Sequence, residues 1–240
     1  RSVDQGATWE QIAQPKGVKW SNLFLHQGEL YLFGTDQTYG RLVIRRSQDG
    51  GHSWTEPTDG QQGLLRDDFE YHTAPMPMLI HQGRIFRAVE VRNPPEKWGV
   101  NLQALVISAP VDSDLLHASS WQTSNRLPFD PAWPVGNAWL EGNIVRSPEG
   151  TLHNILRLNE KPYGGRAARV DVSDDGQQIS FDPESGFLYF PGGCKKFTIR
   201  YDSTSQRYWT LTNFNRDIGH NPERTRNCLS LVSSPDLKTW

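Results

Sequence analysis

The sequence predicts an all-β protein in which a unit of four antiparallel strands is repeated along the chain. A short turn motif recurs several times, and the intervals between its copies contain hairpin-forming stretches of hydrophobic and polar residues. No 10-residue stretch keeps the hydrophobic period of a helix. The 21 glycines and 16 prolines among 240 residues also favour a turn-rich β protein over a helical one.

The turn motif is best preserved in two copies. Residues 2–9 read S-x-D-x-G-x-T-W, and residues 47–54 read S-x-D-x-G-x-S-W with identical spacing. Weaker copies occupy residues 173–181 and 234–240, and the loosest lies at 112–121. In such a turn the aspartate accepts backbone N–H groups, the glycine supplies an unusual backbone conformation, and the aromatic side chain packs beneath. We therefore interpret the motif as a marker of the fold and not as a catalytic sequence.

Four predicted hairpins separate the copies of the motif. They lie at residues 23–33, 78–86, 144–156 and 197–211, and a third strand follows each of them at 42–46, 105–108, 168–172 and 229–232. Four-stranded units repeated radially describe a β-propeller. We expect one domain over 1–240, with units at roughly 10–54, 55–121, 122–181 and 182–240 and with both ends incomplete. A parent of five or six blades follows from this count.

Composition and motifs exclude several function classes. A net charge of −2 without a block of lysines and arginines gives no support to binding of nucleic acid. No run of 18 apolar residues is present, so no membrane insertion is expected. Because His-x-x-x-His, Cys-x-x-Cys and a glycine-rich phosphate loop are all missing from the sequence, we expect no metal and no cofactor. The oligomeric state is left open.

The turn motif resembles the Asp-box, and a propeller that carries it resembles the sialidase superfamily of BNR-repeat proteins. Residues 72–90, 139–143 and 196–202, with Arg226 and Asn227, look like a bacterial subgroup labelled sialidase-like, and the likeness covers essentially the whole chain. The resemblance implies a six-bladed propeller that acts on glycans. The Arg-Ile-Pro motif and the tyrosine nucleophile of a true sialidase would lie outside these residues. We expect an extracellular or periplasmic location.

The first strand of each unit should line the axial channel, where ligands of propellers bind. Each of these strands carries polar residues where the pattern expects apolar ones: Asn22, His72, Glu141 with Asn143, and Lys196. Glu141 is the leading catalytic carboxylate, because an aromatic and apolar neighbourhood suits a general acid. The alternative is a glutamate that is paired with an arginine at a strand end.

Glu90 and His72 are the other catalytic candidates. Two carboxylates from neighbouring units, Glu90 and Glu141, would suit acid, base or nucleophile work on a glycosidic bond. The alternative for Glu90 is a surface salt bridge with Arg87 or Arg92. His72 could act as a general base or bind a sugar hydroxyl, and the alternative is a hydrogen-bonded core histidine.

Arginine matches a sugar carboxylate with two parallel hydrogen bonds, so basic residues are the leading binding candidates. Arg157 ranks first and Arg226 second, ahead of Arg87, Arg166, Lys196, Arg200 and Arg216. Trp139, with Trp98 and Trp133, could stack on a sugar or could cover the core instead. Asn22 and Asn143 complete the predicted binding set.

Three functions are compatible with these residues. The first is an exo-acting glycoside hydrolase with Glu141 as acid or base. The second is a polysaccharide lyase with His72 or Tyr71 as base and with an arginine or lysine that neutralises a uronate. The third is a non-catalytic propeller that binds glycans. A fold alone does not decide among them.

Overall fold

A computed structural model describes residues 1–93, 100–160, 164–214 and 224–240. Its secondary structure is β-strand throughout, apart from one 3-10 turn at Ala118–Ser120. The predicted all-β class is therefore confirmed. Among the described residues no helix has the length and apolar character needed to cross a membrane. The candidates Trp98 and Arg216 lie outside the described ranges.

The described strands pair antiparallel and form three sheets. The first is one continuous sheet of β1 (Lys19–His26), β2 (Glu29–Thr35), β3 (Gly40–Ser47), β4 (Leu64–His72), β6 (Arg84–Arg92), β7 (Leu102–Pro110) and β8 (Gln122–Thr123), with β5 (Leu79–His81) paired to β6. All four predicted hairpins are present, as β1–β2, β5–β6, β9–β10 and β14–β15.

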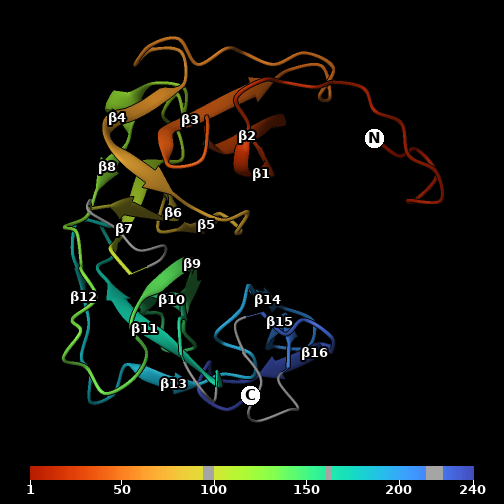
Figure 1. The fold of residues 1–240 in the computed structure, drawn as a ribbon. Coiled ribbons are helices and arrows are strands. Elements are labelled where there is room, and N and C mark those ends of the chain that lie inside the picture. The colour runs from red at the N-terminus through yellow and green to blue at the C-terminus, as the bar shows by residue number, and fades with distance from the viewer. Residues whose placement is uncertain (94–99, 161–163, 215–223) are drawn as a thin grey trace.

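The remaining strands form two further sheets. One contains β9 (Trp139–Arg146), β10 (Leu152–Leu158), β11 (Arg166–Val172), β12 (Ile179–Ser180) and β13 (Phe187–Tyr189), and the other contains β14 (Thr198–Asp202), β15 (Arg207–Asn213) and β16 (Leu229–Ser234). The sheets follow one another along an arc, with β1 near one end and β14 to β16 at the other (Figure 1).

Strand β4 connects the first two units and thereby positions a candidate residue. Its first half pairs with β3 through Leu64 and Arg66, and its last residues pair with β6, where His72 lies opposite Glu90. β4 ends at His72, and the second short inner strand, β5, begins at Leu79. The interruption at 73–78 leaves His72 at the end of a strand.

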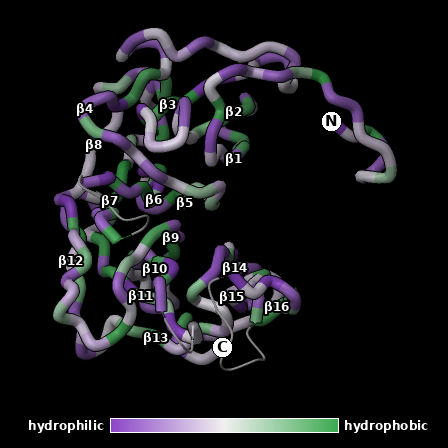
Figure 2. The backbone as a smooth tube through the Cα atoms, viewed as in Figure 1, coloured by the Kyte–Doolittle hydropathy of each residue, from purple (hydrophilic) through white to green (hydrophobic). Residues whose placement is uncertain are grey.

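The core consists of three clusters of buried side chains between the sheets. Each cluster draws on neighbouring units; Phe86 of β6, for example, packs in one cluster with Trp139 of β9. Hydrophobic segments fall largely within the strands in Figure 2, whereas the peripheral loops are mostly hydrophilic. Side chains between successive sheets hold the units together, as expected when apolar faces are stacked.

The two well-preserved copies of the turn motif make the same hydrogen bonds. The Asp49 carboxylate accepts from the Ser53 N–H at 2.9 Å and from its hydroxyl at 2.6 Å, and the Gly51 N–H donates to the Ser47 hydroxyl at 2.8 Å. The indole of Trp54 donates to the Gly51 carbonyl at 3.0 Å. Residues 2–9 repeat all of these bonds. Gly51 has φ of +96°, which explains the glycine in the motif.

The outer faces of the first and last units carry exposed leucines. Leu23 and Leu25 alternate along β1 with 60% and 68% of their surface exposed, and Leu229 and Leu231 alternate along β16 with 70% and 62% exposed. Residues two apart on a strand share a face, so each pair marks one apolar side of its sheet. Both sheets lie at the ends of the arc (Figure 1).

Candidate functional site

A pocket of about 570 Å³ lies at the start of the inner strands. Its lining residues come from all four units: Trp20, His72, Glu141, Arg157, Asn159, Lys196, Arg224 and Arg226. The predicted candidates His72, Glu141, Arg157, Lys196 and Arg226 therefore share one cavity. The sequence analysis expected polar residues to converge at one end of the channel, and these residues line a cavity in the structure.

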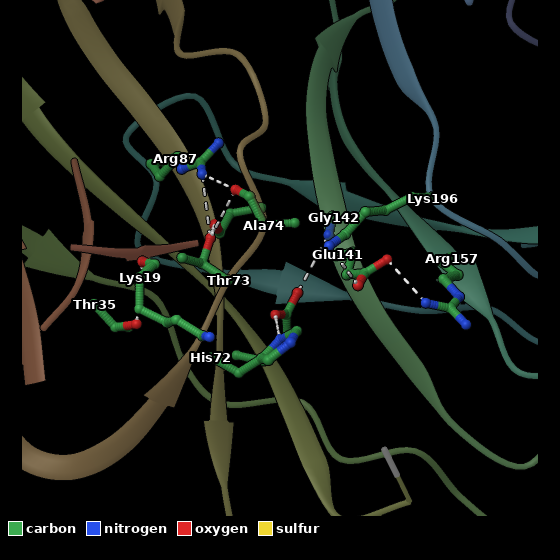
Figure 3. A network of polar contacts seen from close by, with 12 residues as sticks. Lys19, Thr35, His72, Thr73, Ala74, Arg87, Glu141, Gly142, Arg157 and Lys196 are labelled. Atoms are coloured by element: carbon green, nitrogen blue, oxygen red, sulfur yellow. Dashed lines mark hydrogen bonds and ion pairs between the residues drawn. The ribbon is translucent and has the colours of Figure 1, made fainter. Parts of the chain in front are cut away.

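Glu141 is buried and faces two basic side chains. Its Oε2 accepts a hydrogen bond from Nη1 of Arg157 at 3.1 Å, and its Oε1 lies 3.4 Å from Nζ of Lys196 (Figure 3). The pairing of Glu141 with an arginine, which was the alternative interpretation of this residue, is thus present. The carboxylate still lines the pocket, so ion pairing does not remove it from reach of a ligand.

The backbone at Glu141 explains how this side chain enters the pocket. Glu141 has φ of +60°, and the register between β9 and β10 shifts at this point, so one extra residue is inserted as a β-bulge. A Cβ on the following Gly142 would lie 2.1 Å from Oδ1 of Asn154, so only glycine fits there. A bulge re-aims a side chain out of the normal alternation of a strand.

Trp20 reaches the same pocket through a second bulge. The register between β1 and β2 shifts between Lys19 and Asn22, and Trp20 has φ of +49°. Positive φ is uncommon for a bulky residue, and strained positions of this kind concentrate at functional sites. The ring of Trp20 meets His72 edge-on at a centroid distance of 4.5 Å.

His72 and Glu90 form a buried pair behind the pocket. Nδ1 of His72 lies 2.7 Å from Oε2 of Glu90, and Oε1 of Glu90 accepts the N–H of Gly142 at 3.2 Å. With Nδ1 engaged, Nε2 is the ring nitrogen that a ligand in the pocket can use. Glu90 is fully buried and Arg92 pairs instead with Glu70, so the alternative of a surface salt bridge at Glu90 is wrong.

The pocket has an excess of positive charge. Arg157, Lys196, Arg224 and Arg226 line it, whereas Glu141 is the one carboxylate among the described lining residues. Arg157 is held in place by a second bond, from its Nε to the Cys194 carbonyl at 2.8 Å. Such a set favours an anionic ligand, because guanidinium and ammonium groups bind carboxylates by charge-assisted hydrogen bonds.

Arg87 was predicted to bind substrate, and the structure corrects this. Its guanidinium is fully buried and donates to the carbonyls of Ala74 and Met76 and to the Thr73 hydroxyl (Figure 3). Burial lowers the pKa of Arg87 to about 9. Arg87 therefore fixes the segment that follows His72 and does not contact the pocket.

Three other predicted binding residues lie elsewhere. Trp139 is fully buried in the core against Phe129. Of the two alternatives for this residue, it therefore packs in the core and does not stack on a sugar. Asn143 is buried too, and its Oδ1 accepts the N–H of Ile199 at 3.1 Å, which ties β9 to the last sheet. Asn22 lines a different pocket, further along β1. Trp139 and Asn143 therefore stabilise the fold, whereas Asn22 lines a separate cavity.

The sequence analysis missed three residues that line the pocket, Trp20, Asn159 and Arg224. Trp20 stood next to the predicted Asn22, and only the bulge moves the tryptophan instead of the asparagine into the pocket. Arg224 lies on a loop, and no pattern in the sequence marks it. Among the described residues no group of His, Cys, Asp or Glu is arranged to hold a metal ion.

Comparison with known proteins supports the fold. No protein-family model and no curated protein matches the sequence. Among solved structures, the α-L-arabinanase of Cellvibrio cellulosa matches with a TM-score of 0.53 and 14% identity, over 93% of this chain and 72% of that one. The GH43 endo-arabinanase of Bacillus licheniformis matches with a TM-score of 0.55 and 12% identity, over 96% of this chain and 76% of that one.

A third similar structure is the endo-arabinase of Bacteroides thetaiotaomicron, with a TM-score of 0.54 and 11% identity, over 95% of this chain and 84% of that one. At these identities the likeness concerns the fold. The chain therefore shares the antiparallel β-propeller architecture of glycoside hydrolases such as these.

Proposed function

We propose that the protein is a carbohydrate-active enzyme that cleaves glycosidic bonds in this pocket, as an exo-acting glycoside hydrolase. The observation that carries the proposal is the convergence of an oriented histidine, His72, and a carboxylate, Glu141, in one cavity. Its volume of about 570 Å³ lies in the range of small-ligand sites. The propeller fold shared with arabinanases is consistent with this class.

The proposed reaction adds water across the bond between the anomeric carbon and the leaving oxygen. Nε2 of His72 exchanges a proton with the leaving oxygen or with the attacking water, while Glu90 holds the imidazole in position. The Glu141 carboxylate stabilises the positive charge that develops at the anomeric carbon or attacks it. Arg157 and Lys196 hold this carboxylate in place.

The substrate class that we propose is an acidic sugar. Arg224 and Arg226 line the pocket and are exposed. A guanidinium binds a carboxylate with two parallel hydrogen bonds, and it gives up less hydration than an ammonium does. A neutral sugar would leave this positive charge without a counter-ion. Sialosides and uronic-acid glycosides are therefore the substrates to test first.

A polysaccharide lyase is the second candidate, and the observation that favours it is the set of arginines that line the pocket. A lyase needs a base for the proton next to a uronate carboxylate and cations that neutralise that carboxylate. His72 oriented by Glu90 would take the proton, and the arginines would bind the uronate. The C–O bond to the leaving sugar then breaks as a carbon–carbon double bond forms, and the protonated His72 returns the proton to the leaving oxygen, so that no water is consumed.

One assay separates the candidates. The purified protein is incubated with sialosides, uronic-acid oligosaccharides and neutral glycosides, and products are followed by chromatography and ultraviolet absorbance. A hydrolase releases sugar without new absorbance, whereas a lyase gives an unsaturated, absorbing product. Binding without any product would overturn both enzymatic proposals and leave a glycan-binding propeller.

We also propose how the rest of the fold is arranged. The hydrogen bonds of residues 2–9 and 47–54 support an Asp-box assignment for these turns. The exposed leucines of β16, Leu229 and Leu231, support a further blade that packs on this sheet, and the sialidase-like resemblance implies six blades in all. A glycan-active propeller of this kind would work outside the cytoplasm.

A further inference from the structure

A second groove lies at the opposite end of the same inner strands. Its larger part, about 570 Å³, is lined by β9 beyond Ile144, by β14 beyond Ile199 and by Pro77 to Leu79. A smaller part of about 260 Å³ continues along β1 from Asn22 to Leu25. The two parts share Pro77, Met78 and Arg200, so they form one continuous groove.

This groove is separate from the candidate active site. No residue lines both it and the pocket of His72 and Glu141. Along β9, Arg146 follows Glu141 by five residues, which corresponds to about 16 Å of extended strand. A ligand in the groove would therefore lie at the other mouth of the channel.

The groove combines cations with aromatic rings. Arg146 and Arg200 both line it and are exposed, and no aspartate or glutamate is found among its described lining residues. Tyr201 is 54% exposed, and its ring packs against Tyr208 at a centroid distance of 4.9 Å. The Tyr208 hydroxyl donates to the Arg146 carbonyl at 2.6 Å, which fixes the supporting ring.

We propose that this groove is a second saccharide-binding site, which holds an acidic oligosaccharide without cleaving it. An exposed tyrosine that is supported from behind offers a flat apolar surface to a sugar ring, and its hydroxyl can still face water. Two arginines without an acidic neighbour in the groove complement carboxylate or sulfate groups. Pro77 and Met78, which line both parts of the groove, add apolar surface for the sugar rings.

The groove suits a chain of sugars better than a single one, because its two parts run from the last unit across to the first. It lacks an oriented acid–base pair like that of His72 and Glu90 among its described residues, so binding is the function that its chemistry supports. This proposal goes beyond the proposed enzymatic activity and does not depend on it. A polymer held here would be retained near the active pocket.

The test is calorimetric titration of the 240-residue chain with three probes: an oligogalacturonate, a sialylated oligosaccharide and a sulfated oligosaccharide, each with a neutral analogue. Variants Tyr201→Ala and Arg200→Ala remove the ring and one cation. Tyr189→Ala and Arg126→Ala are the matched controls, because Tyr189 is 61% exposed, Arg126 lies over Phe69, and neither residue lines the groove.

We expect the chain to bind two molecules of at least one acidic probe, one in the pocket and one in the groove. The neutral analogues should not bind in the groove. Tyr201→Ala and Arg200→Ala should each weaken binding in the groove by about tenfold or more, which corresponds to about 1.4 kcal/mol, and both controls should bind normally. Binding of every probe by the variants as tightly as by the parent chain would overturn the second site. Absence of cleavage with binding in the groove intact would count against the proposed enzyme alone.

Discussion

The repeated turns and the inner strands of this propeller follow opposite rules. Residues 2–9 and 47–54 have the same residue types at the same spacing and make the same hydrogen bonds. The pocket, by contrast, is lined by a tryptophan, a histidine, a glutamate and a lysine, one from each unit. Residues that repeat between units maintain the fold, whereas residues that do not repeat build the site.

Positive φ occurs in both regions of the backbone. In the repeated turns it falls on glycine, as in Gly51, but also on Gln5 and Leu237. Trp20 and Glu141 have positive φ without being glycine, and both lie at bulges in inner strands. Strain of this kind persists only where the surrounding contacts enforce it. Glu90 supplies one of these contacts through the Gly142 N–H.

Removing the pocket histidine should have the largest effect on activity. We expect His72→Ala to lower kcat by about 10²–10⁴-fold, the usual contribution of a general acid or base, and added imidazole to restore part of the rate. The matched control is His26→Ala, because His26 is also buried but bonds the Val111 carbonyl outside the pocket. Steady-state kinetics with and without imidazole provide the measurement. Unchanged kcat in His72→Ala would show that the histidine is structural.

Removing one pocket cation should have an intermediate effect that depends on the substrate. Arg226→Ala is expected to raise KM for an acidic substrate by about 10-fold or more, as the loss of a charged hydrogen bond does, and to leave a neutral analogue nearly unaffected. Arg126→Ala is the control, because Arg126 lies over Phe69 and does not line the pocket. If Arg226→Ala changed KM equally for acidic and neutral substrates, the arginine would not recognise the charge.

A change in the repeated turn should affect stability and leave activity intact. Asp49→Ala removes the acceptor of the Ser53 N–H and hydroxyl, so we expect the melting temperature to fall by roughly 5 °C. Asp67→Ala, an exposed aspartate of β4, is the control. Thermal denaturation and kinetics on the same samples provide the test. Lost activity at an unchanged melting temperature would contradict the structural role of the motif.

Acid should weaken the turns, although each effect is small. Hydrogen bonds from Thr8 lower the pKa of Asp4 to about 2. Around Asp236, burial raises the pKa, but N–H groups of Thr239 and Lys238 outweigh it and bring it to about 2. A carboxyl with a lowered native pKa stabilises the fold above its unfolded value, and the effect is lost as pH falls from about 4 to about 2.

The pH prediction has its own test. The melting temperature of the protein should drop over that acidic range, and Asp236→Asn should flatten the drop relative to the parent. The same decrease in Asp236→Asn and in the parent would mean that other groups control acid stability. The comparison requires identical ionic strength, because exposed carboxylates are sensitive to screening.

The sequence predicted the fold well because the fold depends on local patterns. Glycine turns and alternating hydrophobic residues identified the hairpins β5–β6 and β9–β10, whose bonds lie between near neighbours in the chain. The sheet continuity through β4 was not foreseen, since one strand serves two neighbours only once the units are packed. No local signal announces such a shared strand.

The site was predicted in part. His72, Glu141, Arg157, Lys196 and Arg226 all line the pocket. Glu141 lies on the inner strand β9 and His72 ends β4, whereas Arg157 lies on the second strand β10, and Lys196 and Arg226 lie outside the strands. Strand alternation misplaced Asn22 and missed Trp20, because a bulge shifts the side chains by one residue. Arg87 resembles a ligand-binding arginine in sequence, and its carbonyl partners are known only from the folded structure.

The central claim is that Glu141 acts on substrate and is not just the partner of Arg157. Glu141→Gln keeps the shape and one acceptor for Arg157 but removes the charge and the proton chemistry. Glu160→Gln is the matched control, because Glu160 is equally buried and paired with Arg166 at 2.7 Å but does not line the pocket.

The decisive measurement is the turnover rate and the melting temperature of both variants on a confirmed substrate. We predict that Glu141→Gln loses about 10²–10⁴-fold in rate while its melting temperature falls no more than that of Glu160→Gln, which keeps full activity. Full activity of Glu141→Gln, or a large loss of stability with most of the rate retained, would contradict the assignment.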